Sequence, residues 1–475
     1  MFLCVYSRLL EQYQAITLRA GSLVSPNFIT TNRDQQYLFP PSIQDWLPED
    51  HLARFVVDIV SQLNIRPLSE VYGGRGSKAY HPAILLFLLF YGYATGVYSS
   101  RKIEQATYDS VAFRFISVNT HPDHDTIATF RKRFLDQLQP LFVQILVLAR
   151  EMGVMKLGKV SLDGTKVKAN ASKHHALSWG HACKLEKQLQ AEVQELMLLA
   201  EKADSEQTPE GMDIPEELSR RQDRLTAIAK AKEKIAQRAA ERYALEQQEY
   251  EAKVAKRKAK AEKTGKKPRG PKPKSPESGP RKKDQVNLTD EESRIMPTSG
   301  KGFEQAYNAQ ATVDVDTMII VESHVSQSPN DKKEITPTLL ALKSPPESLG
   351  KVDSILVDTG YFSDANVSSC KQAKIEPFIP PGREKHNQSL TERFATQEPL
   401  PEDADSISKM RYKLKTDEGR RLYAKRKSTV EPVFGIIKHV MGFRQFLLRG
   451  FESVIGEWTL VSMAWNLKRM FALKV

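Results

Sequence analysis

Three acidic residues lie where a carboxylate could take part in chemistry. Asp163 lies inside the strand-like stretch 159–168, where Asp is normally disfavoured. Asp358 directly follows the apolar run 354–357, and Glu431 lies near the start of a late helical stretch. Carboxylates brought together from separate elements are ligands for Mg²⁺, and two such ions can clamp the reacting oxygens in phosphodiester cleavage. The spacing is therefore compatible with metal-dependent phosphoryl transfer.

Each acid also has a simpler structural explanation. The Asp-Gly pair at 163–164 is a strong signal for a hairpin turn, and Asp358 could start a turn. Glu431 completes a capping box with Ser428, and Pro432 disfavours helical geometry at the residue before it. The residues alone leave the ligand role and the structural role open.

Cations accompany two of the acids. Lys166 and Lys168 alternate along the strand that contains Asp163, so both are expected on one face. Lys438 follows Glu431 by two helical turns, which places both on the same side of a helix. We expect these lysines to contact phosphate groups.

Composition limits the class of protein. The chain has 475 residues, of which 40% are hydrophobic, and this length predicts several domains. Its three cysteines show no CxxC spacing and no disulfide framework, which favours a reducing, cytoplasmic compartment. The most apolar run, 84–97, is too short to cross a bilayer and predicts a buried helix. No association with a membrane is expected.

The positive charge is concentrated in one segment. Residues 256–283 contain thirteen Lys or Arg and two Glu, which is +11 of the total of +12. The same segment is rich in Pro and Gly, so residues 256–290 are predicted to be a disordered basic linker. It could be a solvated spacer, or an arm that adds salt-dependent affinity for nucleic acid. The density of like charge favours the arm.

Helical patterns occupy two further regions. Residues 31–148, which follow a weakly structured extension at 1–30, predict an all-α domain that contains a short basic helix. Such a set of short helices suits either DNA binding by a helix-turn-helix or a plain helical bundle. The cations of the basic helix are Arg131, Lys132 and Arg133. Residues 175–255 have helical spacing broken near 211–215, which predicts an inserted helical hairpin or coiled coil.

Strand signals return after the insertion. A predicted hairpin at 310–323 is followed by a helix at 330–342, a buried strand at 354–357 and a short strand at 376–379. With the strand around Asp163, this order is the ribonuclease H-like arrangement. The predicted fold is therefore α/β: a ribonuclease H-like core, interrupted by a helical, basic insertion and preceded by the all-α domain. The core is expected to comprise residues 155–174 and 295–473.

Four core segments resemble bacterial insertion-sequence transposases of the DDE type. They read SLDGTKVKANASKH, SRIMPTSGKGFEQAYNAQ, VDTGYFSDAN and STVEPVFGIIKHVMGFRQFLLRGFESVIGEW. The stretch NRDQQYLFPPSIQDWLPEDHLARFV is similar to the helical domain that precedes the catalytic core in the same proteins. The resemblance extends over residues 31–473.

The resemblance implies a set of site residues. The three acids would be the catalytic ligands of Mg²⁺ or Mn²⁺, and Lys438 and Tyr423 match the family's lysine and tyrosine. The family's arginine is displaced by one residue, because the expected spacing to the glutamate falls on Lys427 while the arginine is Arg426. Either residue could contact the phosphate beside the three acids, which are Asp163, Asp358 and Glu431.

The resemblance also implies an activity. The protein would bind the terminal inverted repeats of a mobile element, cleave DNA phosphodiester bonds and join the freed 3′-hydroxyl ends to target DNA. It would act on double-stranded DNA as a homodimer assembled on that DNA, in the cytoplasm at the nucleoid. Two other functions stay open: a catalytically inactive DNA-binding regulator derived from a transposase, and a coiled-coil scaffold with a basic arm. We expect one of Arg131, Lys132 and Arg133 to contact bases and its neighbours to contact phosphates.

Overall fold

The computed structural model describes residues 42–72, 79–203, 213–265, 270–298, 302–344, 346–382 and 404–474. The extension predicted at 1–30 lies outside these residues. The chain divides into two units after Trp46, and the first contributes only the 3-10 helix η1 (Ile43–Trp46) to the described residues. All other elements belong to the second unit, which begins at Leu47.

A run of helices forms the first part of this unit, as the sequence predicts. The buried helix α4 shows how the sequence sets its ends: Pro82 occupies the first turn, and His81 caps it by accepting a hydrogen bond from the Ala83 amide. Gly96 ends it in the left-handed region at φ 84°. The helices are α2 (Leu52–Ser61), α3 (Arg66–Ser69), α4 (Pro82–Thr95), α5 (Ser100–Asp109), α6 (Val111–Ile116), α7 (His124–Arg133) and α8 (Leu138–Glu151).

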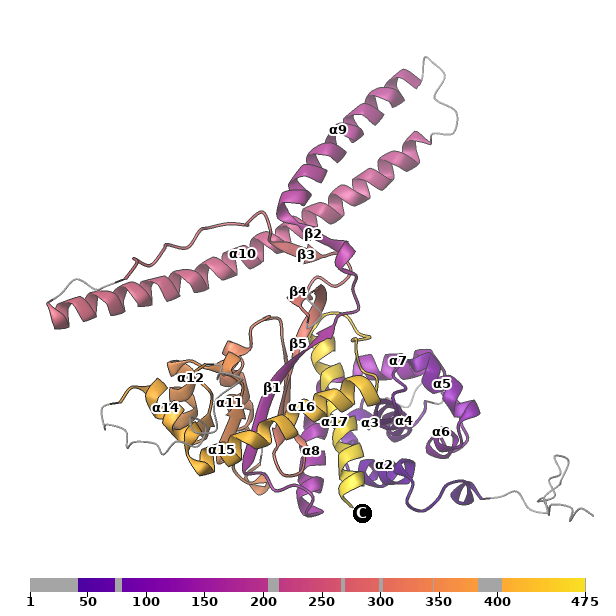
Figure 1. Cartoon of the computed structure of the whole chain (residues 1–475). Coiled ribbons are helices and arrows are strands. Elements are labelled where there is room, and N and C mark those ends of the chain that lie inside the picture. The colour runs from indigo at the N-terminus through magenta and orange to yellow at the C-terminus, as the bar shows by residue number, and fades with distance from the viewer. Residues whose placement is uncertain are drawn as a thin grey trace, which may run out of the picture. The chain divides into compact units, whose positions relative to one another are not determined.

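A mixed β-sheet lies at the centre of the unit (Figure 1). Its strand order is β4-β5-β1-β7-β8, and β6 also pairs with β5. The central strand β1 is antiparallel to β5 and parallel to β7. The strands are β1 (Lys159–Lys168), β4 (Arg294–Pro297), β5 (Phe303–Asp314), β6 (Ile320–Ser326), β7 (Ser354–Val357) and β8 (Glu376–Phe378).

The predicted strand around Asp163 is confirmed, and it contains no turn at the Asp-Gly pair. Strand β1 continues through both residues, with Asp163 opposite Ala311 and Gly164 opposite Gln310 on β5. Because side chains alternate across a strand, Asp163 and Gly164 face opposite sides of the sheet.

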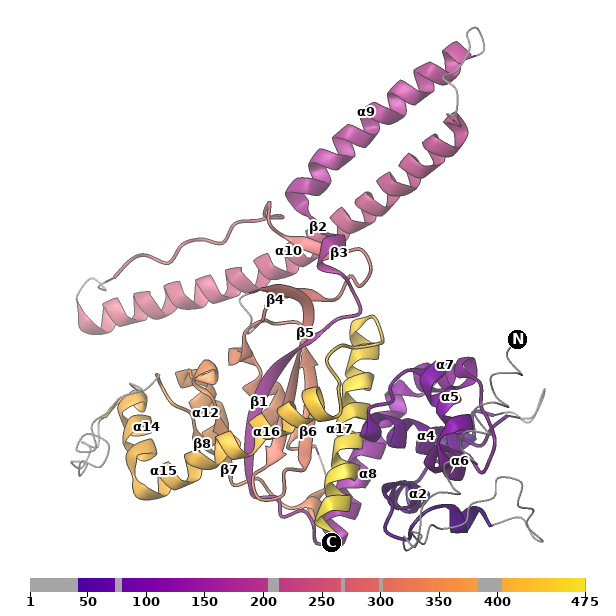
Figure 2. The ribbon, with the colours of Figure 1, turned by 45° about the vertical axis from the view of Figure 1, so that its right-hand side comes forward.

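Helices cover the sheet. They are α11 (Ile335–Ala341), α12 (Asp364–Gln372), α14 (Ser406–Lys415), α15 (Asp417–Ala424), α16 (Val430–Gly435) and α17 (Phe451–Leu473). Helix α17 packs against β6 on one side and against α4 and α8 on the other (Figure 2). It is therefore buried all round, and Trp458 donates a hydrogen bond from Nε1 to the Gln310 carbonyl at 2.9 Å. The all-α part and the sheet thus share this helix.

Over the described residues, no single helix is both long and apolar enough to cross a membrane. Only α4 and α5 taken together pass on length and composition, and they meet at a bend of 95°. Most of α4 is buried within the protein, as the sequence predicts for its apolar run.

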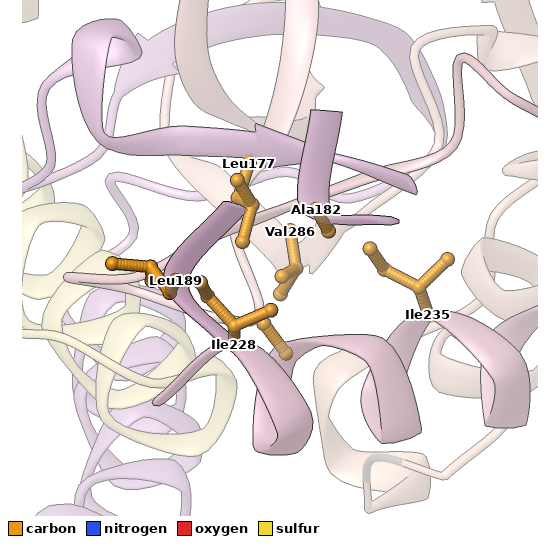
Figure 3. Packing of buried hydrophobic residues seen from close by; sticks show 7 residues of the cluster. Leu177, Ala182, Leu189, Ile228, Ile235 and Val286 are labelled. Atoms are coloured by element: carbon orange, nitrogen blue, oxygen red, sulfur yellow. The ribbon is translucent and has the colours of Figure 1, made fainter. Parts of the chain in front are cut away.

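The segment between β1 and β4 forms a helical hairpin, α9 (Trp179–Ala203) and α10 (Ile214–Thr264). Two short strands close its base, β2 (Ala176–Ser178) and β3 (Gln285–Asn287), which pair antiparallel. The sequence pattern predicts the helices but not these strands, which are three residues long. Apolar side chains from both helices and both strands form one cluster there (Figure 3): Leu177, Ala182, Leu189, Ile228, Ala231, Ile235 and Val286.

The structure differs from the prediction of a disordered linker at 256–290. Helix α10 continues through residue 264, because Ala, Lys, Arg and Glu all favour helix until Gly265 ends it at φ 61°. The guanidinium of Arg257 then donates to the carbonyls of Gly270 and Pro271, at 2.8 and 2.9 Å. Arg281 contacts Glu246 at 3.1 Å, so the returning chain is tied to α10.

Candidate active site

Asp163 is held rigidly by its place in the central strand. Its side chain is 22% exposed, and its Oδ1 accepts a hydrogen bond from the Gly164 amide at 2.8 Å. Burial raises the pKa of Asp163 to about 6, although the Gly164 amide and Arg426 each favour the ionised form. A cation placed beside Asp163 would favour its ionised form.

Asp358 and Glu431 come to the same place from two other elements. Asp358 directly follows β7, whose Val357 pairs with Leu162 on β1, so Asp358 at the end of β7 lies at the level of Asp163 within the adjacent parallel strand β1. Glu431 lies in the first turn of α16, which packs against β1. Both side chains are about half exposed, at 51% and 48%.

Asp358 does start a turn, through its backbone carbonyl and not its carboxylate, and the capping box at Glu431 is absent. Asp358 stands at the N-cap of the 3-10 helix η6 (Thr359–Tyr361), but its side chain makes no capping hydrogen bond. Helix α16 likewise has no side-chain cap, and the Ser428 hydroxyl donates to the Lys425 carbonyl instead. Pro432 fits because it lies in the first turn, where its missing N–H is not needed.

Arg426 joins the three acids. It lies on the 3-10 helix η7 (Lys425–Ser428), and its side chain is only 8% exposed. Its Nη1 donates to Asp163 Oδ2 at 3.3 Å, and its Nη2 donates to Glu431 Oε1 at 2.9 Å. The same Nη2 is 3.8 Å from Asp358 Oδ1. One guanidinium is therefore the common counter-ion of three carboxylates from β1, the end of β7 and α16.

The electrostatic balance at Arg426 favours its charged form. Burial by itself lowers the pKa of Arg426, but Tyr423 and the three acids outweigh burial and raise it. Burial raises the pKa of Tyr423 to about 12, so this phenol stays neutral beside the guanidinium. Lys427, the alternative position for the family's arginine, is exposed.

The donor set suits a hard divalent cation, because carboxylate oxygens are the preferred protein ligands of Mg²⁺ and Mn²⁺. The guanidinium of Arg426 stands in for such a cation, since it gathers the carboxylates of all three acids. Within the described ranges, no group of three or more His, Cys, Asp or Glu is already arranged as a metal site. The residues fit a metal, but Arg426 occupies the space between them.

The predicted phosphate-binding lysines differ in how far they are buried and in the groups they contact. Lys438 lies on the π-helix η8 (Ile436–Val440) and donates to Thr165 Oγ1 at 2.5 Å and to the Lys166 carbonyl at 2.9 Å. Burial and the nearby Lys166 lower the pKa of Lys438. Lys438 therefore lies beside β1, two residues beyond Asp163. Lys168 is more exposed, at 56%, and lies 3.7 Å from Glu304.

The basic helix α7 separates its three cations. Arg131 is buried, and its Nη1 donates to Tyr93 Oη at 3.0 Å and to the Tyr98 carbonyl at 3.1 Å. Tyr93 in turn donates to Glu457 on α17. Arg131 thus ties the helical part to α17 and has no surface to offer DNA in this arrangement. Lys132 and Arg133 are exposed.

A second titratable cluster lies on β6, apart from the three acids. His324 contacts Glu322 through Nδ1 at 2.8 Å and Glu334 through Nε2 at 3.2 Å. Burial by itself lowers the pKa of His324, but the two glutamates together raise it to about 9. Both glutamate side chains are only 6% exposed, so a protonated His324 neutralises part of a buried negative charge.

Sequence reasoning missed Asp331, Gln310 and Tyr361, which lie behind the acids. Asp331 accepts hydrogen bonds from Lys166 and Gln310, and Gln310 accepts one from Tyr361. The sequence offers one indirect signal, Gly164, whose missing side chain makes room for this group.

Two family models match the chain. Residues 41–133 match the Transposase domain (DUF772), and residues 269–467 match the Transposase DDE domain. The chain therefore belongs to the insertion-sequence transposases of the DDE type. The DDE match includes Asp358 and Glu431 and begins after Asp163, whose place beside them comes from the fold. No curated protein and no solved structure matches the chain.

Proposed function

We propose that the chain is an active DNA transposase whose sheet is a ribonuclease H-like core. The strand order supports this fold: β5 and β6 form a hairpin beside the central β1, and β7 and β8 continue in parallel on the other side. The observation that carries the function is the meeting of Asp163, Asp358 and Glu431 at one cationic centre.

The three acids would hold two Mg²⁺ or Mn²⁺ ions from three elements, β1, the end of β7 and α16. When bound, such ions activate the attacking oxygen and stabilise the leaving oxygen of an in-line displacement. In the first reaction, a water oxygen attacks phosphorus and the P–O3′ bond breaks, which frees a 3′-hydroxyl. In the second, that hydroxyl attacks a target phosphodiester, and one P–O bond forms while another breaks.

The surrounding cations would position the DNA. Arg426, once released from the acids, is placed to contact a phosphate beside them, and the exposed Lys427 can contact the adjoining backbone. Lys438 would support the same strand from its place beside β1. Lys132 and Arg133 on α7 are the exposed candidates for binding element ends, and the basic segment 256–283 would add affinity for any sequence.

The substrates would be the element's terminal inverted repeats and a target duplex, in the nucleoid. Cutting and joining two ends requires two active sites, so we propose a homodimer assembled on DNA. The competing function, an inactive DNA-binding regulator, predicts the same binding without cleavage.

The test is cleavage of a duplex that contains the element's end, in Mg²⁺. Asp163→Asn, Asp358→Asn and Glu431→Gln should each abolish cleavage and retain end binding, and a double variant should be little worse than a single one. The matched control is Asp353→Asn, which removes an exposed acid at the opposite end of β7 and should cleave normally. Cleavage that survives Glu431→Gln, or wild-type protein that binds without cutting, would refute the proposal.

A further inference from the structure

A largely buried group of polar side chains lies against the backbone of β1, on the face of the sheet opposite to Asp163. Gly164 faces the side of the sheet opposite to Asp163 and leaves space for this group. A Cβ atom at residue 164 would lie 2.1 Å from Gln310 Nε2, 2.7 Å from Asp331 Oδ1 and 2.9 Å from Asn308 Oδ1. These side chains therefore touch the main chain of the residue that follows the first acid.

Asp331 is the anionic centre of this group. It begins the 3-10 helix η4 (Asp331–Lys333), and one of its oxygens, Oδ1, accepts three hydrogen bonds. The donors are Lys166 Nζ at 3.0 Å, Asn308 Nδ2 at 2.6 Å and Gln310 Nε2 at 2.9 Å. Lys166 is thereby held by Asp331, with only 18% of its side chain exposed.

Gln310 connects this group to the second acid. Its Oε1 accepts a hydrogen bond from Tyr361 Oη at 2.6 Å, and Tyr361 ends η6, the 3-10 turn that begins at Asp358. Asn366 provides a second connection between η4 and η6. Its Nδ2 donates to the carbonyls of Tyr361 in η6 and Lys332 in η4, at 2.7 and 2.8 Å. Gln310 is fully buried, and Tyr361 is 1% exposed.

We propose that Gln310, Asp331 and Tyr361 are positioning residues that fix the separation between Asp163 and Asp358. The chain of contacts runs from the β1 backbone at Gly164, through the Gln310 carboxamide, to the turn that begins at Asp358. The inference rests on the proposed function, because it assigns these residues to the support of its metal ligands. It also places Lys166 in this support and not on DNA.

The physical reason is the narrow geometry that Mg²⁺ demands. Magnesium needs near-ideal octahedral coordination, so carboxylates that shift relative to each other lose affinity for it. Groups behind the ligands of a metal site commonly change its affinity by about 10–100-fold when they are removed. Asp163 and Asp358 come from strands that pair through only four residue pairs, so contacts beyond the strand pairing are needed to fix the two carboxylates relative to each other.

The test compares two Tyr→Phe variants in the full-length protein. Tyr361→Phe removes the hydroxyl that joins Gln310 to η6, and Tyr307→Phe removes an equally buried hydroxyl that donates to Asp290 at 3.0 Å. Each variant leaves a buried acceptor without its hydroxyl donor, so both should lower the thermal stability without metal, and Tyr307→Phe at least as much, because its acceptor is a carboxylate contacted at both oxygens. The readout is the Mg²⁺ concentration that gives half of the maximal thermal stabilisation.

We expect Tyr361→Phe to raise this Mg²⁺ midpoint about tenfold and Tyr307→Phe to leave it unchanged. Asp331→Asn, which replaces the carboxylate by its isostere, should raise it as well. Equal midpoints for the two Tyr→Phe variants would overturn the inference, because the hydroxyl of Tyr361 would then have a structural role alone. A wild-type protein that Mg²⁺ does not stabilise, or whose stabilisation survives Asp163→Asn, would instead refute the proposed function.

Discussion

Arg426 should stabilise the metal-free active site, and a bound metal ion should compensate for the loss of its charge. The variant Arg426→Met keeps most of the apolar stem and removes the charge. In the metal-free protein it leaves Asp163, Asp358 and Glu431 facing one another without their common counter-ion. Their repulsion and the lost hydrogen bonds should lower the free energy of unfolding.

The structure limits the size of this effect. Removing one partner of a fully buried ion pair costs about 3–5 kcal/mol, because the other charge stays buried without compensation. Here Arg426 is buried, but two of its three partners are about half exposed, at 51% and 48%, and water screens them. We therefore expect Arg426→Met to lose about 1–3 kcal/mol without metal.

Saturating Mg²⁺ should reduce that loss, because the bound cation takes over the neutralisation of the acids and no longer competes with a guanidinium. The assay is urea unfolding of wild type and variant with and without Mg²⁺. The control is Lys427→Met, which removes an exposed neighbouring cation and should change stability by less than about 0.5 kcal/mol. A loss for Arg426→Met that is the same with and without Mg²⁺ would refute the competition between the arginine and the metal.

Three further predictions concern other parts of the chain. Neutralising the cations of 256–283 should weaken binding to all duplexes alike and flatten the dependence of log K on log salt, as titrations at several salt concentrations would show; loss confined to the element's ends would contradict this. Arg131→Ala should lower the free energy of unfolding by about 3–5 kcal/mol, because it breaks a buried hydrogen-bond network. Lys132→Ala and Arg133→Ala should leave the free energy of unfolding unchanged and weaken binding to the element's ends, as footprinting would show. His324, with its pKa raised to about 9, should contribute roughly 3 kcal/mol of stability that is complete below about pH 6.5 and lost as the pH rises through 9. His324→Gln should therefore flatten the stability profile between pH 6.5 and 9, and an unchanged profile would contradict the ion pairs of His324 with Glu322 and Glu334.

The sequence was sufficient to predict the elements that position the acids. Val160 and Leu162 mark β1 by their apolar, strand-forming character, and β7 carries the apolar run 355–357 because it is buried on both faces. These local patterns locate Asp163 and Asp358 without any knowledge of tertiary contacts. The long helices of the hairpin were predictable for the same reason, although helix propensity extends α10 into the basic segment further than charge alone suggests.

Contacts between distant segments could not be predicted in this way. Asp331 is bound by side chains from β1 and β5, and no periodicity marks an acid whose partners lie that far away in the sequence. Arg131 looks like a surface cation because charged side chains are seldom buried, yet it is buried and donates to the Tyr93 hydroxyl and the Tyr98 carbonyl. Arg426 reaches three acids only because η7 presents it beside β1 and α16, which the spacing of a basic stretch does not reveal.

The most direct test of the central claim is to locate the metal. Crystals of the full-length protein grown with Mn²⁺ should show anomalous scattering between the carboxylates of Asp163, Asp358 and Glu431, with the guanidinium of Arg426 withdrawn from them. Asp163→Asn crystals grown in the same way should lose that signal. Manganese bound elsewhere, such as at Glu322 and Glu334, with Arg426 still joining the three acids at saturating Mn²⁺, would contradict the account.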